Sequence, residues 1–179
     1  MTIRELLTFP NPVNDKAART VAGGVLLLAV LTLLTGWHWL IALIALGFLA
    51  RVLSGPRFSV LGQLATRVIA PRLGPAKLVP GPPKRFAQGI GAMLTVGALV
   101  AWLAGAAGQA AVLVGLVVVA ATLESVLAIC LGCRIFALLM RAGIIPPEVC
   151  LACSDLSGRL AAAAATSPSS STAAGRATP

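Results

Sequence analysis

The sequence predicts an all-α integral membrane protein: a four-span transmembrane helical bundle with a cytoplasmic amphipathic helix and a short cytoplasmic Cys-rich C-terminal module. The first observation is composition, because only 11% of the 179 residues are charged and 58% are hydrophobic. Soluble domains average about 25% charged residues. The second is the presence of apolar runs near the ~20 residues that cross a bilayer. The third is a clustering of Lys and Arg, which explains the net charge of +9 through topology, so we expect a lipid bilayer and no nucleic acid as partner.

The first two spans are expected at residues 17–35 and 37–53, after a cytoplasmic lead-in at 1–16. Both runs are almost wholly apolar. The connection Gly36-Trp37-His38-Trp39 carries two tryptophans, which are typical of a membrane interface. His38 is the only histidine in the chain, so we interpret it as an interfacial polar residue rather than as a ligand or a proton carrier.

A central loop follows at 54–85, and prolines that stop helices mark both of its ends. Within it, apolar residues recur at helical spacing and predict an amphipathic helix at 58–70, lying in the lipid headgroup plane. Packing of this helix on the bundle is the alternative. The apolar positions are Phe58, Leu61, Leu64, Ala65 and Val68, and the outward polar positions are Ser59, Gln63, Thr66 and Arg67.

The third and fourth spans are expected at 86–104 and 110–131, completing a membrane domain over 17–142. The β-branched run in the last span is predicted to be helical because lipid does not tolerate an open strand. We expect this helix to continue past Cys130. Residues 143–157 then carry a second cysteine pair, and the Ala, Ser, Thr and Pro composition of 158–179 predicts a disordered tail.

All fourteen Lys and Arg residues fall into three segments of the chain. The positive-inside rule therefore places the N-terminus, the central loop and the C-terminus in the cytoplasm. An even number of spans follows. The basic residues are Arg4, Lys16 and Arg19, then Arg51, Arg57, Arg67, Arg72, Lys77, Lys84 and Arg85, then Arg134, Arg141, Arg159 and Arg176.

The four cysteines form two Cys-x-x-Cys pairs, Cys130 with Cys133 and Cys150 with Cys153. This spacing lets two sulfurs meet in a small-ring disulfide, and cytoplasmic thiols are kept reduced, so we favour two redox pairs that relay a disulfide without a cofactor. Within the first pair we predict that Cys133 attacks, because it lies beside Arg134 at a possible helix start. Cys130 is expected to be deeper, and burial raises the pKa of a thiol.

Two other interpretations of the cysteines remain open. Cys130, Cys133, Cys150 and Cys153 follow a C-x₂-C-x₁₆-C-x₂-C spacing that suits tetrahedral zinc, which would make the chain a membrane scaffold with a structural metal site. They could also simply pack as small hydrophobic residues.

Glu124 is an acid within the last apolar run, where a charge is costly and indicates a functional site. It could carry protons for the thiols, or it could form a structural ion pair with Arg51 or Arg57. A small-molecule transporter that uses Glu124 is the third function class. The sequence contains no catalytic triad, phosphate loop or dinucleotide fingerprint.

Three separated motifs carry a resemblance to a known family: Ser54-Gly55-Pro56-Arg57-Phe58-Ser59, Pro82-Pro83-Lys84-Arg85-Phe86, and Cys130-x-Gly132-Cys133 with Cys150-x-x-Cys153. Over roughly residues 10–156 the chain resembles the bacterial membrane-protein family catalogued as domain of unknown function 4395. The resemblance implies a small multi-pass protein of the bacterial cell (inner) membrane. It also implies a thioredoxin-like or sulfurtransferase protein of the cytoplasm as partner, and hence thiol or sulfur chemistry without naming a reaction.

Overall fold

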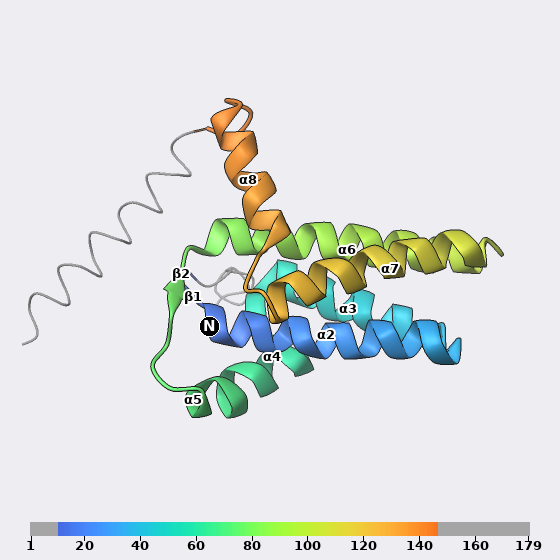
Figure 1. Ribbon diagram of the computed structural model, residues 1–179, viewed down its shortest axis with the longest axis horizontal. Coiled ribbons are helices and arrows are strands. Elements are labelled where there is room, and N and C mark those ends of the chain that lie inside the picture. The colour runs from blue at the N-terminus through green and yellow to red at the C-terminus, as the bar shows by residue number, and fades with distance from the viewer. Residues whose placement is uncertain (1–10, 147–179) are drawn as a thin grey trace, which may run out of the picture. The chain divides into compact units, whose positions relative to one another are not determined.

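Four long helices dominate the chain, which we describe from a computed structural model over residues 11–146. They are α2 (Asp15–Thr35), α3 (Trp39–Ser54), α6 (Gly81–Leu103) and α7 (Ala107–Ser125). Helix α2 packs against α3 and α7, and α6 packs against the same two, so the four form a closed bundle (Figure 1). Each belongs to a helical stretch long and apolar enough to cross a membrane. The predicted multi-pass helical architecture is confirmed to that extent.

The two short connections of the bundle lie together at one end. Helix α2 ends where Gly36 adopts a left-handed conformation with φ 70°, which glycine adopts without steric cost, and its N–H donates to the carbonyl of Thr32. His38 then stacks on Trp102 near the end of α6, with ring centroids 5.5 Å apart. The α2–α3 connection is therefore beside the α6–α7 connection, as an up-and-down bundle requires.

A two-stranded antiparallel sheet, which the sequence did not lead us to expect, joins the starts of α2 and α6. Strand β1 (Val13–Asn14) pairs with β2 (Leu78–Val79). Asn14 also caps α2, because its side chain accepts a hydrogen bond from the N–H of Lys16 at 3.0 Å. The sheet therefore fixes Asp15, the first residue of α2, close to the beginning of α6.

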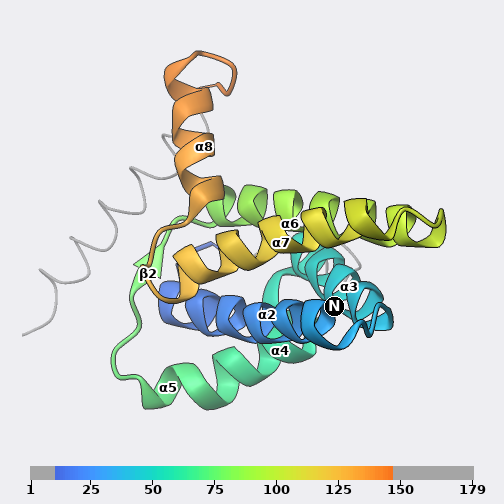
Figure 2. The same cartoon turned by 45° about the vertical axis from the view of Figure 1, so that its right-hand side comes forward.

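The central segment is helical in short pieces: η1 (Gly55–Arg57), α4 (Val60–Leu64), the π-helix η2 (Ala65–Ile69) and α5 (Ala70–Arg72). The predicted helix at 58–70 is thus present. It packs along α2 in both views of the ribbon (Figures 1 and 2).

The apolar residues of this segment divide between two faces. Ala65 and Ala70 are buried in the same core as α2, whereas Val60 is 84% exposed and Val68 is also exposed. The segment therefore packs on the bundle and still presents an apolar face outward. Ser59 was expected among the outward polar residues, and this was wrong: it is buried, because its hydroxyl caps α4 by accepting from the N–H of Gly62.

Two boundaries of the long helices differ from the sequence prediction by more than three residues. Helix α6 begins at Gly81 rather than 86, because the first turn of a helix tolerates Pro82 and Pro83. Helix α7 ends at Ser125 rather than 131, and a new helix, α8 (Leu131–Arg141), begins after a turn. In that turn Ala128 has φ 58°, which no helix continues through. The uninterrupted helix expected past Cys130 is therefore wrong.

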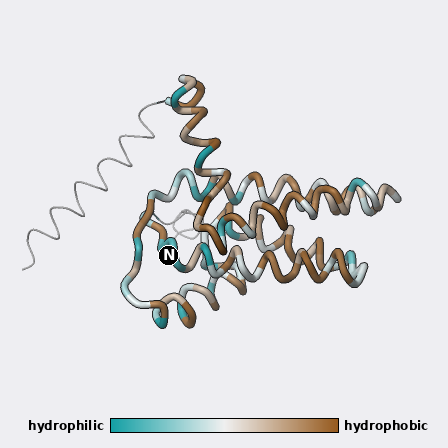
Figure 3. Tube along the Cα trace, in the orientation of Figure 1, coloured by the Kyte–Doolittle hydropathy of each residue, from teal (hydrophilic) through white to brown (hydrophobic). Residues whose placement is uncertain are grey.

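The core of the bundle consists mainly of small and β-branched residues, so the helices approach closely. Figure 3 shows hydrophobic colouring along much of the long helices, and several of their large apolar side chains are exposed, among them Leu27, Leu46 and Met93. Such exposed apolar surface is expected where lipid rather than water surrounds the protein. The core cluster contains Ala17, Val21, Val25, Ala29, Ile41, Ile44, Ala65, Ala70, Ala98, Val114, Val117 and Ala121.

Candidate functional site

The first cysteine pair forms the N-terminal turn of α8. Cys130 is the N-cap residue, and its sulfur accepts a hydrogen bond from the backbone N–H of Cys133 at 3.4 Å. This is the position that Ser or Asp commonly takes in order to satisfy a free N–H at a helix start. The partial positive charge of a helix N-terminus favours an anion there. Cys130 therefore lies where a thiolate is stabilised.

The two thiols are free and their pKa values move in opposite directions. A hydrogen bond from the Cys133 side chain lowers the pKa of Cys130, and the same contact raises the pKa of Cys133. These directions favour Cys130 over Cys133 as the thiolate, which is the opposite of the order that the sequence predicted. The premise of that prediction, a helix starting at Cys133, fails because α8 starts at Leu131, two residues earlier in the sequence, and Cys130 is its cap.

Helix α8 is held on α6 by a glycine and two aromatic rings. A Cβ atom on Gly132 would lie 2.5 Å from the Cα of Ala87, a distance that no side chain tolerates. The rings of Phe86 and Phe136 pack at 5.6 Å between centroids. The glycine inside the first Cys-x-x-Cys thus allows the start of α8, and with it both thiols, to contact the start of α6.

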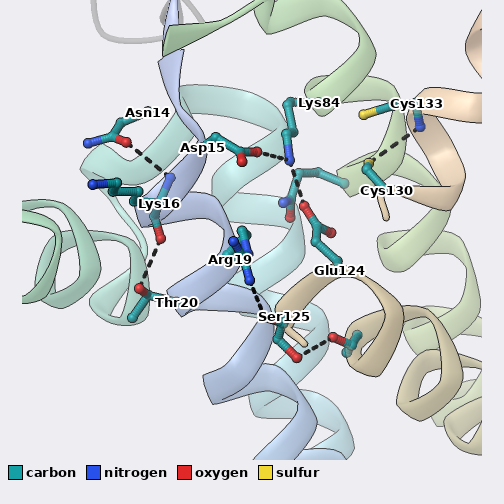
Figure 4. Close-up of polar contacts among 12 residues, drawn as sticks. Asn14, Asp15, Lys16, Arg19, Thr20, Lys84, Glu124, Ser125, Cys130 and Cys133 are labelled. Atoms are coloured by element: carbon teal, nitrogen blue, oxygen red, sulfur yellow. Dashed lines mark hydrogen bonds and ion pairs between the residues drawn. The ribbon is translucent and has the colours of Figure 1, made fainter. Parts of the chain in front are cut away.

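Lys84 bridges two carboxylates beside the thiols. Its Nζ lies 3.0 Å from Oδ1 of Asp15 and 2.8 Å from Oε1 of Glu124, and only 6% of the residue is exposed. Figure 4 shows Lys84 between the two acids, with Cys130 next to them. The expectation that Glu124 pairs with Arg51 or Arg57 was wrong, because the β1–β2 sheet and the first turn of α6 place Lys84 closer.

The interruption after α7 explains why Glu124 and Cys130 are neighbours. Arg19 of α2 donates from Nη2 to the carbonyl oxygen of Ser125 at 3.1 Å, which satisfies one of the last carbonyls of α7. The chain then turns, and Ile129 donates back to the carbonyl of Leu123 at 2.9 Å. A continuous helix would have separated Glu124 from Cys130 by about 9 Å along its axis.

Arg51 is the second buried cation of this end of the bundle. It is 4% exposed, and its Nε donates to Oε1 of Gln88 at 2.9 Å while Nη1 donates to the hydroxyl of Ser59 at 3.0 Å. Its guanidinium also lies 4.6 Å from the centre of the Phe48 ring. Nη2 has no hydrogen-bond partner among residues 11–146.

Part of this cluster of polar groups lines a cavity of about 260 Å³. Arg51, Gln88, Glu124 and Cys130 contribute to its wall, together with apolar residues of α2, α3, α6, α7 and α8. The remaining lining residues are Val21, Ala22, Val25, Phe48, Ala87, Ile90, Gly91, Leu94, Leu116, Val117, Val119, Ala120, Ala121, Leu131, Gly132 and Ile135.

The structure thus brings three of the predicted site residues together: Cys130, Cys133 and Glu124. Cys150 and Cys153 lie outside the described residues. Over 11–146 no group of three His, Cys, Asp or Glu side chains is placed to hold a metal ion, and the zinc hypothesis needs the second pair. Sequence reasoning missed three residues, Asp15, Lys84 and Gln88, and named Arg51 only as an ion-pair partner of Glu124. A charge just before a predicted span was a signal for Asp15 and Lys84.

Comparison with known proteins identifies a family but no individual relative. No curated protein and no solved structure matches the chain. A family model does match, over residues 13–141, which include the bundle, the Lys84 cluster and the first cysteine pair. The chain therefore belongs to the family described as a domain of unknown function (DUF4395).

Proposed function

We propose that the chain is a membrane-bound thiol–disulfide redox protein whose reactive pair is Cys130 and Cys133. The position of Cys130 supports this most strongly: its sulfur caps α8 and accepts the N–H of Cys133 at 3.4 Å. Reactive cysteines are thiolates near positive charge or at helix N-termini, and they are partly accessible. Cys130 meets these conditions, because it is half-buried and lies beside Lys84, whose charge also lowers its pKa.

The reaction follows from the asymmetry of the pair. The Cys130 thiolate attacks a disulfide of a soluble partner, forming a mixed disulfide and releasing one partner thiolate. Cys133 then loses its proton and attacks the Cys130 sulfur, which forms the intramolecular disulfide and releases the second partner thiolate. The two cysteines are oxidised and the partner disulfide is reduced to two thiols. A thioredoxin-like protein or a sulfurtransferase has the thiol chemistry required of such a partner.

Glu124 is the proposed acceptor of the proton that leaves Cys133. Glu124 and Cys130 line the same cavity, which supports this role. Its ion pair with Lys84 supports the structural alternative, in which Glu124 only neutralises a buried cation. A conservative Glu124→Gln variant separates the two, since a proton acceptor changes the pH dependence of disulfide formation and a structural partner changes only stability.

The proposed location is the bacterial cell (inner) membrane, with both termini and the thiols on the cytoplasmic side. Clustering of all Lys and Arg away from the two short connections supports this orientation. Cys150 and Cys153 would then receive the disulfide from the first pair and pass it on. The structural-zinc scaffold and the transporter remain the alternative proposals, and metal content distinguishes the first of them.

The test is an equilibrium redox titration of the purified full-length protein in glutathione buffers, read as the mass of alkylated cysteines. A Cys150→Ser/Cys153→Ser variant isolates the first pair. We expect one reversible transition between two free thiols and a Cys130–Cys133 disulfide. Absence of that disulfide at every ratio of oxidised to reduced glutathione, with near-stoichiometric zinc in the wild-type protein, would support the scaffold instead.

A further inference from the structure

We infer that the cavity beside Cys130 binds a neutral quinone from the lipid phase, which accepts the two electrons of the Cys130–Cys133 dithiol. This inference rests on the proposed redox function, with the quinone taking the place of the partner disulfide as the oxidant of the pair. It is carried by an unpartnered guanidinium nitrogen, the balance of charges around the cavity, and the apolar residues at its outer side.

The polar part of the cavity offers hydrogen-bond donors. Arg51 is 4% exposed and its Nη2 has no partner among the described residues, although an unpaired buried donor is costly. Gln88 uses its Oε1 to accept from Arg51 Nε at 2.9 Å, so its amide nitrogen remains available to donate. A ligand that binds to these two donors, the guanidinium of Arg51 and the amide of Gln88, needs a hydrogen-bond acceptor such as a carbonyl oxygen.

The charges on and next to the cavity wall disfavour an anionic ligand. Arg51 is a cation and Glu124 an anion of the wall, and Lys84, which pairs with Glu124 at 2.8 Å and with Asp15 at 3.0 Å, lies behind it. With the Cys130 thiolate included, these groups carry one net negative charge. An added anion would enter a poorly solvated site without compensation, which is expensive. A phosphate or carboxylate ligand is therefore disfavoured against a carbonyl compound.

The opposite side of the cavity is apolar and reaches the outer surface of the bundle. Leu116 and Val119 of α7 line it and are 50% and 55% exposed, and Leu131 and Ile135 of α8 line it and are also exposed. On a membrane-crossing helix such residues face lipid. The volume of about 260 Å³ lies just below the ~300–1,000 Å³ of most ligand pockets. It suits an aromatic head group whose apolar tail extends into the bilayer.

The redox balance is complete with this ligand. The Cys130 thiolate and the Cys133 thiol together lose two electrons and the one proton of Cys133 and form one S–S bond, and water supplies the second proton that the quinol needs. The quinone gains two electrons and two protons and becomes a quinol. Each disulfide formed therefore yields one quinol. Both carbonyl oxygens of the ligand become hydroxyls, and the quinol can leave into lipid by the apolar side.

The experiment uses the reduced full-length protein in lipid nanodiscs, without oxygen, with a fully substituted benzoquinone that carries a short isoprenoid tail. Full substitution prevents direct addition of thiols to the ring. Quinol formation is followed by absorbance and disulfide formation by mass. Ala120→Phe fills the cavity without removing a polar group, and Val112→Phe places the same ring on a lipid-facing position of α7 outside the cavity. Arg51→Gln removes the unpartnered donor.

We expect oxidation that saturates with quinone concentration, one quinol per disulfide, and no effect of Val112→Phe. Ala120→Phe should slow it about tenfold or more, as should Arg51→Gln if that variant folds. Val112→Phe should also leave disulfide formation with oxidised glutathione unchanged, and oxidation of the wild-type protein by glutathione reports the function of the dithiol itself. Normal oxidation by glutathione with no saturable oxidation by quinone, or with no effect of Ala120→Phe, overturns the quinone site and leaves the dithiol function intact. Failure with both oxidants overturns the dithiol function itself, and the quinone inference with it.

Discussion

The two ends of the helical bundle are built from different interactions. At the end with the short connections, His38 stacks on Trp102, and Trp37 and Trp39 are more than half exposed. At the other end, Lys84 and Arg51 are buried with their polar partners, and Cys130 lies next to them. Placing Trp or His side chains at a membrane interface costs little free energy, because the ring packs against apolar groups while its polar atom remains hydrated.

Burying charges is expensive, and replacing a buried ion pair by apolar residues is often neutral or stabilising. The Asp15–Lys84–Glu124 cluster is therefore not needed merely to hold helices together. Its position beside a thiol at a helix N-terminus instead indicates a chemical role for that end of the molecule. The difference between the ends supports the proposed site at the end that contains Lys84 and Cys130.

The largest expected contrast between the two ends is their membrane side. Reporter fusions at Trp37 and Gln109 should read outside, and fusions at Lys77 and Ser170 should read inside, because all basic residues lie away from the short connections. Each position is checked with two reporters, an enzyme that is active only outside the cytoplasm and a protein that fluoresces only inside it. A cytoplasmic signal at Gln109 would overturn the proposed orientation.

Removal of Lys84 should be the most destabilising single change in the bundle. Lys84→Met leaves Asp15 and Glu124 buried without a counter-charge, and breaking a buried pair in this way typically costs about 3–5 kcal/mol. Thermal unfolding in detergent measures the loss. His38→Ala, at the other end, removes one aromatic stack and should cost only about 0.5–1.5 kcal/mol. Equal losses for the two variants would contradict the contrast between the ends.

A smaller loss of stability is expected when a closely packed glycine is replaced by alanine, and no loss when the glycine has free space around it. Gly132→Ala places a Cβ 2.5 Å from the Cα of Ala87 and should cost about 1–3 kcal/mol, because the start of α8 must move away from α6. Gly115→Ala has no neighbouring atom within 4 Å of the added carbon. Because Ala favours helix, that control should keep or raise stability, by up to about 1 kcal/mol. The same unfolding measurement compares them, and the reverse order would refute the close α6–α8 contact.

The four long helices could be predicted from the sequence because apolar length alone determines them. Their ends could not be predicted equally well. Pro82 and Pro83 were interpreted as helix stops, yet in a first turn they are compatible with the helix. The end of α7 depends on Arg19, which is far away in the sequence and satisfies the carbonyl of Ser125.

The two thiols and the acid of the site could be predicted from the sequence, but their partners and geometry could not. The Cys-x-x-Cys spacing identified Cys130 and Cys133, and the position of an acid within an apolar run identified Glu124. The partner of Glu124 was not predictable, because Lys84 and Arg85 are adjacent and only the folded structure decides which one turns inward. The predicted order of reactivity of the two thiols depended on a single helix boundary, and an error of two residues in that boundary is enough to reverse the order.

The most direct test of the account is the rate at which iodoacetamide labels each cysteine of the reduced full-length protein at several pH values. The pKa of Cys130 is lowered and that of Cys133 raised, so at pH 7 Cys130 should be labelled at least about tenfold faster. As pH rises, labelling of Cys130 should reach its plateau well before labelling of Cys133 increases. Cys133→Ala removes the donated hydrogen bond and should slow the labelling of Cys130 at pH 7, whereas Cys133→Ser keeps a donor and should slow it less. Faster labelling of Cys133, or equal labelling of both thiols, would contradict the assignment of Cys130 as the reactive thiolate.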